Sequence, residues 1–165
     1  MVRGGAEHFV CSVTPYAPTL QLPHLAFEGV SKKTRPQLAR GALVYARVAP
    51  VNRFLETELT CVDPASGKSE GLGELKSGML FDVSLGFARR LLLSKQREKG
   101  GISALEDLAE KVAFEIAVGR NGKVWVDSAS VKDTLLVGKI LQETDRGYLG
   151  LEEQKKLVRK LLKTR

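Results

Sequence analysis

The stretch Phe114-Glu115-Ile116-Ala117-Val118-Gly119-Arg120-Asn121-Gly122-Lys123-Val124-Trp125-Val126 decides the fold of the second half of this chain. Every second residue is apolar on both sides of the Gly119–Gly122 segment, which is the period of a half-buried β-strand. An Asn-Gly pair between two such runs is a strong hairpin signal, because both residues tolerate the positive φ that a type I′ turn requires. The sequence therefore predicts a β-hairpin with a type I′ turn at Asn121 and Gly122.

The segments around this hairpin predict one further strand and three helices. Phe81, Val83 and Leu85 alternate with polar residues, which indicates a strand, and a short helix should follow over 87–93. Ser103 and Glu106 have the spacing of a capping box, so a second helix should run to about residue 111. A third helix should open at Ser130 and Asp133 by the same spacing and reach about residue 144.

The order over residues 79–144 is therefore β-α-α-β-β-α, which is typical of a eukaryotic KH domain, a three-stranded sheet covered by three helices. An amphipathic helix that carries Leu157, Val158, Leu161 and Leu162 should follow it. The first 65 residues instead suggest short strands over 8–13, 43–49 and 54–62, with Pro15, Pro18 and Pro23 interrupting the segment after the first. The predicted fold class is α+β.

The turn-rich residues 63–68 suggest the boundary between two domains. We expect a partial all-β OB-fold over residues 1–65 and a KH domain with an extra C-terminal helix over 66–165. The formal charge is +7, and residues 1–50 hold six Lys/Arg against two Asp/Glu, or 6 − 2 = +4. A basic surface attracts phosphate backbones, which favours a polyanionic partner.

Residue types that carry chemistry are sparse. Cys11 and Cys61 lie in apolar runs and are expected to be reduced core residues. The two histidines lack the spacing of a metal site, and we find no nucleophile motif, phosphate loop or convincing carboxylate set for a two-metal nuclease. Asp63 is interpreted as a turn former and Asp82 as a solvent-facing strand residue. We expect no catalytic residue, no metal and no cofactor.

The residues Gly119-Arg120-Asn121-Gly122-Lys123-Val124-Trp125-Val126 resemble the Gly-x-Asn-Gly signature of the noncatalytic cap subunits of the eukaryotic RNA exosome. Residues 27–36 with 41–47, and residues 78–85, match the same family, so the resemblance covers roughly residues 8–150. It implies an N-terminal domain, an OB-fold of the ribosomal S-one type and a KH domain. Such subunits hold together a ring of RNase-PH-like subunits and guide RNA to a 3′-to-5′ nuclease.

This resemblance implies single-stranded RNA, the ring subunits and other cap subunits as partners, with a role in rRNA processing and RNA decay. No apolar run is long enough to span a membrane and no secretory signal is apparent, so we expect a cytoplasmic or nuclear location. The resemblance implies the nucleus and nucleolus, and also the cytoplasm. A freestanding KH/OB regulator of translation or mRNA stability is the main alternative, and an active nuclease is a third hypothesis.

Two departures from the family pattern lead to further expectations. Only about 65 residues precede the KH region, and Met1 to Glu7 do not resemble a strand. We therefore expect a shortened chain that lacks the N-terminal domain and the first barrel strand. KH domains clamp nucleic acid with a Gly-x-x-Gly loop between their first two helices. Residues 94–101 lack this motif, so we expect no independent clamp there.

The sequence yields two groups of candidate site residues. The basic candidates for RNA binding are Lys32, Lys33, Arg35, Arg40 and Arg47, although a solvated or protein-docking loop is equally consistent with them. The glycines of the hairpin motif should supply positive φ and a close backbone approach, plausibly at the junction of the two domains. That structural family motif consists of Gly119, Asn121, Gly122 and Trp125.

Two interpretations stay open at this point. Trp125 fits the core or a domain interface better than a base-stacking platform. The C-terminal helix presents five cations opposite its leucines, which suits a solvated face better than RNA contact; they are Lys155, Lys156, Arg159, Lys160 and Lys163.

Overall fold

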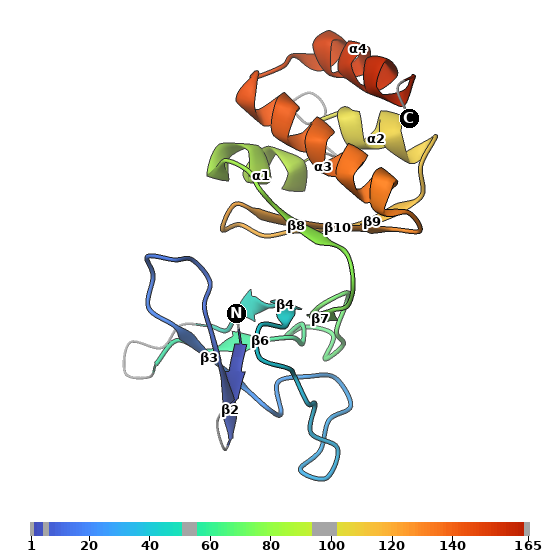
Figure 1. Cartoon of the computed structure of the whole chain (residues 1–165). Helices are drawn as coiled ribbons and strands as arrows, with labels where there is room; N and C mark the ends of the chain where they lie inside the picture. Colours follow the sequence, from blue (N-terminus) through green and yellow to red (C-terminus); the bar gives the residue numbers. More distant parts are fainter. Residues whose placement is uncertain (1, 5–6, 51–55, 94–101, 164–165) are drawn as a thin grey trace. The chain divides into compact units, whose positions relative to one another are not determined.

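The computed structural model describes residues 2–4, 7–50, 56–93 and 102–163, which form two compact units (Figure 1). The first unit ends at Lys76 and the second begins at Ser77. The boundary thus lies after the one expected between residues 65 and 66, because residues 73–75 form a strand that belongs to the first unit. Within the described residues, no helix has both the length and the apolar character needed to cross a bilayer.

The first unit consists of small antiparallel sheets. Its strands, within the described residues, are β1 (Val2–Gly4), β2 (His8–Cys11), β3 (Leu20–Pro23), β4 (Leu43–Tyr45), β5 (Arg47–Val48), β6 (Leu59–Thr60) and β7 (Gly73–Leu75). One sheet has the order β1-β2-β3, whereas β4 pairs with β7 and β5 with β6. A single parallel bridge between Gln21 and Glu58 connects two of these sheets.

The core of this unit is built on the alternation of β2. Phe9 and Cys11 are buried and pack with Leu22, Leu59 and Cys61. Both cysteines are free and buried, as the sequence predicted. Burial, followed by the neighbouring thiol of Cys11, raises the pKa of Cys61 to about 12, so this thiol stays protonated at neutral pH.

Two strands of the first unit contradict the sequence-based expectation. Val2 lies opposite Cys11 and Gly4 opposite Phe9, so the segment Met1 to Glu7 does contain a strand. Leu20–Pro23 is also a strand, although we expected prolines to interrupt this region. Pro23 is tolerated because it ends a strand at the edge of the described three-stranded sheet. Both strands form because they pair with β2. A segment of three or four residues is too short for its own sequence pattern to predict such pairing.

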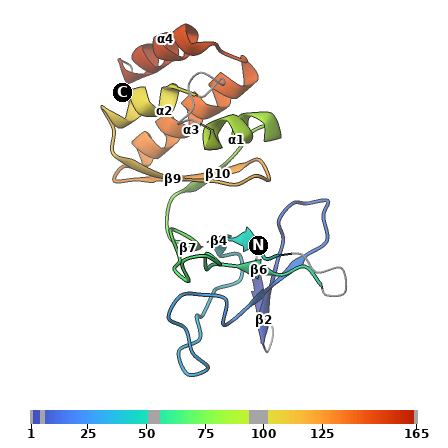
Figure 2. The ribbon, with the colours of Figure 1, turned by 180° about the vertical axis from the view of Figure 1, so that it is seen from behind.

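The second unit has the predicted β-α-α-β-β-α order followed by one more helix. Its elements are β8 (Met79–Asp82), α1 (Leu85–Leu92), α2 (Ala104–Ala109), β9 (Phe114–Val118), β10 (Lys123–Ser128), α3 (Val131–Arg146) and α4 (Leu151–Leu162). The sheet order is β8-β10-β9, with both pairs antiparallel. The helices lie on one face of this sheet, and α4 lies on α2 and α3 on the side away from it (Figures 1 and 2).

The core of the second unit lies between the sheet and α3. Val124 and Val126 of β10 are fully buried with Val137 and Ile140 of α3. One expected boundary differs: β8 ends at Asp82, and Leu85 begins α1 rather than ending the strand. The side chain of Ser84 explains this, because its Oγ accepts a hydrogen bond from Phe87 N at 3.1 Å and caps the helix.

Candidate nucleic-acid interface

The basic loop of the first unit is shaped by two hydroxyl side chains. Ser31 N donates to Thr34 Oγ1 at 2.9 Å, and Thr34 N donates to Ser31 O at 3.1 Å. Lys33 N donates to Ser31 Oγ at 3.3 Å. These bonds satisfy polar backbone groups inside the turn. The side chains of Lys32 and Lys33 are therefore left exposed to solvent, as the sequence predicted.

Three of the five basic candidates border one cavity of about 440 Å³. Lys32, Lys33 and Arg35 line it together with Phe9 and His24, and Pro36, Gln37 and Leu38 complete the wall. Lysine and arginine side chains bind phosphate oxygens through charge-assisted hydrogen bonds. The cavity therefore combines three cationic side chains with a wall that contains the rings of Phe9 and His24.

The ring of His24 forms part of the wall of this cavity. Its ring lies 4.3 Å from the ring of Phe9, measured between centroids. Both imidazole nitrogens are buried and lack a hydrogen-bond partner among the described residues. A buried polar atom without a partner is costly unless something else satisfies it. The ring of His24 therefore forms part of the wall, and its two nitrogens are enclosed rather than exposed to the cavity.

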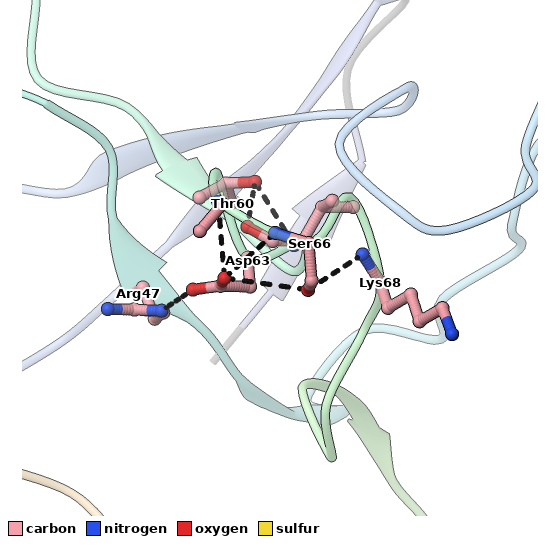
Figure 3. A network of polar contacts seen from close by, with 7 residues as sticks. Arg47, Thr60, Asp63, Ser66 and Lys68 are labelled. Atoms are coloured by element: carbon pink, nitrogen blue, oxygen red, sulfur yellow. Dashed lines mark hydrogen bonds and ion pairs between the residues drawn. The ribbon is translucent and has the colours of Figure 1, made fainter.

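Arg40 and Arg47 are exposed but do not line this cavity. Arg47 forms an ion pair with Asp63 at the turn after β6, as Figure 3 shows. The same carboxylate accepts hydrogen bonds from Ala65 N and Ser66 N, both at 3.2 Å. Asp63 is thus the turn former that the sequence predicted, and Arg47 is held at that turn.

The surroundings of Asp63 act on its pKa in opposite directions. Loss of solvation raises the pKa, whereas the N–H groups of Ser66 and Ala65 and the charge of Arg47 lower it. The lowering contributions prevail, so the carboxylate ionises more readily than an ordinary aspartate. The ion pair is therefore kept well into the acid range.

The hairpin motif forms a different turn from the one expected. Gly122 has φ +77°, but Asn121 does not adopt a positive φ, so the type I′ prediction is wrong. Gly122 N donates to Gly119 O at 3.3 Å and Gly119 N to Lys123 O at 2.8 Å. This is a three-residue loop with a glycine in the left-handed conformation at its end. Asn121 instead accepts a hydrogen bond from Lys123 N through its side chain, at 3.3 Å.

The close backbone approach expected at this motif is present, and it involves the same unit. Val83 N donates to Gly122 O at 2.9 Å. A Cβ atom at Gly122 would lie only 2.6 Å from Val83 O. The motif therefore fixes the turn against the end of β8.

Trp125 is buried, with 5% of its surface exposed. Its Nε1 donates to Ser77 O at 3.0 Å, and a Cβ atom at Gly78 would lie 2.6 Å from Nε1. A ring enclosed in this way has no open face for a nucleobase, so the structure agrees with the core interpretation.

Asp82 has 74% of its side chain exposed, as predicted, and pairs with Lys123 on the adjacent strand.

Sequence reasoning missed the cavity walls contributed by Phe9 and His24. His24 follows β3, and His24 N donates to Glu7 O at 3.1 Å, which places it next to β2. Since this placement depends on strand pairing, no local motif could have revealed it.

Residues 94–101, where we noted the missing Gly-x-x-Gly, lie outside the described residues. Among the described residues, no three His, Cys, Asp or Glu side chains are grouped as a metal site would need.

The chain is thus a tandem of an OB-type β domain and a KH domain. Residues 1–73 match the family model described as "Exosome complex component RRP40, S1 domain", and residues 78–132 match a KH domain model. The chain belongs to the RRP40 family of exosome complex components over the residues that these matches cover. This agrees with the sequence resemblance, which pointed to the cap subunit called ribosomal RNA-processing protein forty rather than its sister, protein four.

Several relatives share this family. The exosome complex component rrp40 of Schizosaccharomyces pombe is 42% identical over 144 residues, which are 87% of this chain and 57% of the relative. RRP40 of Saccharomyces cerevisiae is 37% identical over 84% of this chain and 55% of its own length. RRP40 of Homo sapiens is 29% identical over 85% of this chain and 48% of its own length. The chain therefore spans about half the length of these curated relatives.

A solved structure shares the fold. A crystal structure of a protein assigned as an exosome complex RNA-binding protein superposes with a TM-score of 0.69 at 17% identity. The match covers 97% of this chain and 87% of that one.

Proposed function

We propose that this chain forms the S1 and KH part of a noncatalytic, RNA-binding cap subunit of the RNA exosome. In this role it stabilises the ring of RNase-PH-like subunits and guides single-stranded RNA to 3′-to-5′ degradation and processing, including that of rRNA. The observation that carries the proposal is the cavity where Lys32, Lys33 and Arg35 meet. We also propose that the protein is located in the nucleus and nucleolus, and in the cytoplasm.

The cavity suits the backbone of a single RNA strand. Its cations attract phosphates and release condensed counterions, which makes the affinity depend on salt but little on sequence. Phe9 and His24 add ring surface to the wall beside these cations. A subunit that guides many different RNAs needs binding with little sequence preference, because each RNA strand must be able to pass along it.

The absence of catalysis is part of the same proposal. The cavity lining contains lysines, an arginine and a histidine but no carboxylate. Such a lining can hold a phosphodiester, yet it lacks the carboxylates that two-metal nucleases use as ligands. The lining thus supports binding rather than two-metal cleavage, and we assign cleavage to another subunit.

The experiment combines RNA binding with assembly. The double variant Lys32→Glu, Lys33→Glu should bind a single-stranded oligouridylate more weakly in fluorescence anisotropy, and the salt slope of log K should become shallower by about 0.7 per lost contact. A matched control is Lys111→Glu, Lys132→Glu, which makes the same change of charge at two exposed lysines of the second unit. The control should keep the wild-type salt slope.

A pull-down with RNase-PH-like ring subunits tests the exosome role. Retention of the wild-type chain on the ring supports it. Tight, sequence-selective RNA binding without any association with the ring would instead identify a freestanding regulator of translation or mRNA stability. Metal-dependent degradation of RNA by the purified chain would contradict the noncatalytic assignment.

A further inference from the structure

Helix α4 is fixed in rotation about its own axis. Gln154 and Val158 are buried, with 1% and 2% of their surfaces exposed. Gln154 Oε1 accepts hydrogen bonds from Ser103 N at 3.2 Å and Ala104 N at 3.3 Å, and its Nε2 donates to Leu149 O at 2.9 Å. These bonds tie α4 to the start of α2, so the opposite face of α4 must point to solvent.

That opposite face is basic. We define the α4 basic face as the exposed residues Lys156, Arg159, Lys160 and Lys163. Their spacing of three and four residues places them within about 100° around the helix axis. Lys156, Arg159 and Lys163 form no ion pair with any described residue, whereas the nearby Glu152 pairs with Lys155 at 3.4 Å. Three of the four cations of this face therefore carry a charge that no ion pair with a described residue neutralises.

An exposed aromatic ring precedes this stripe. Tyr148 lies three residues before the first residue of α4, and 83% of its surface is exposed. Its φ is +47°, a left-handed conformation that non-glycine residues seldom adopt. Hydrogen bonds from Tyr148 N to Asp145 O and from Leu149 N to Thr144 O, both 3.2 Å, hold the corner. Packing within the unit gains almost nothing from the ring, so its position suits contact with a ligand.

We propose that Tyr148 and the α4 basic face form a second contact surface for single-stranded RNA. A base stacks on the ring of Tyr148, and the phosphates that follow run along the cations of α4. The helix is about 18 Å long, which is the rise of roughly five stacked nucleotides. Stacking and charge together bind single strands with little sequence preference. This surface rests on the proposed function, since it adds a second RNA contact, in the other unit, to the one proposed for the cavity.

The test measures binding of the whole chain to an oligouridylate as a function of salt. The variant Lys156→Glu, Lys160→Glu should lower the affinity at 0.1 M salt on the order of tenfold and reduce the salt slope by about 1.4. Tyr148→Ala should weaken binding several-fold, whereas Tyr148→Phe should keep the wild-type affinity because the stacking ring remains. Lys111→Glu, Lys132→Glu again serves as the control with the same change of charge.

The outcomes separate this surface from the proposed function. If the α4 variant and Tyr148→Ala both bind like the wild type while Lys32→Glu, Lys33→Glu loses binding, the second surface is refuted and the proposed function stands. Loss of thermal stability in the α4 variant with unchanged RNA affinity would show that the cations only serve the helix dipole, which also overturns the proposal. If the wild-type chain binds no RNA at all, the proposed function fails as well.

Discussion

The ring of Phe81 on β8 lies directly against the backbone of Gly138 on α3: a Cβ atom at Gly138 would lie 2.1 Å from two carbons of that ring. Only glycine allows the helix to approach the sheet this closely. Gly138 is buried in the middle of a helix, where glycine costs about 1 kcal/mol relative to alanine. The close packing of Phe81 is what offsets this cost.

Gly138→Ala should therefore destabilise the second unit, although alanine is the better helix former. Overpacking of a core costs about 1–3 kcal/mol, which exceeds the gain in helix propensity. The fluorescence of Trp125, the chain's one tryptophan, reports unfolding of this unit. Gly86→Ala is the matched control, because Gly86 is also helical and has no atom near its Cβ position. It should leave the melting temperature unchanged or raise it.

Gln154→Met should destabilise the second unit by about 1–3 kcal/mol, because it leaves the buried N–H groups of Ser103 and Ala104 without an acceptor. Amide hydrogen exchange should become faster at these two residues in particular. A general loss of packing would instead raise exchange throughout the unit. Lys156→Met places the same side chain on the exposed face of the same helix and should have little effect. Equal melting temperatures for the two variants would contradict this role of Gln154.

Gly122→Asn and Gly122→Val separate two reasons for a glycine in the hairpin. Asparagine tolerates positive φ, whereas valine does not. Both would bring a Cβ atom to 2.6 Å from Val83 O. We expect a loss of stability with asparagine, and a larger loss, by roughly 1–3 kcal/mol more, with valine. A fully stable asparagine variant, judged by Trp125 fluorescence in urea, would mean that backbone conformation alone demands the glycine.

Asp63 should make the first unit sensitive to acid. Its pKa is lower in the folded chain than the value of about 3.9 expected when unfolded. Its contribution to stability is therefore present in full above about pH 4 and is lost as the pH falls through the lowered folded pKa. Hydrogen exchange of peptides covering residues 60–70 should rise over this range.

Asp63→Asn provides the control for this acid response. Asparagine does not titrate, yet its side-chain oxygen can still accept from Ala65 N and Ser66 N. The variant should lose the ion pair with Arg47 and show less dependence of local exchange on pH below 4. An identical acid response in both proteins would assign the effect to another carboxylate.

Local patterns in the amino-acid sequence were sufficient to predict the KH order of the second unit, the exposure of Lys32 and Lys33, and the turn at Asp63. These follow from local physical chemistry: alternation along strands, and side chains that hydrogen-bond to nearby backbone. The two helices expected from capping boxes do begin directly after Ser103 and Ser130, but neither serine caps its helix with a side-chain hydrogen bond, so that part of the prediction is wrong. The same reasoning found the hairpin but chose the wrong turn, because Gly122 bonds to Val83, a residue that lies after β8 and outside the hairpin.

The remaining features are set by contacts between segments that are distant in the chain. Strands β1 and β3 are too short to have a pattern of their own and exist because β2 pairs with them. That pairing brings Phe9 and His24 to the cavity beside the basic loop, and it does not bring Arg40 or Arg47 there. Likewise, Gln154 orients α4 through N–H groups about fifty residues away in the chain. Contacts between distant segments leave no local periodicity, so these features could not be predicted from the sequence.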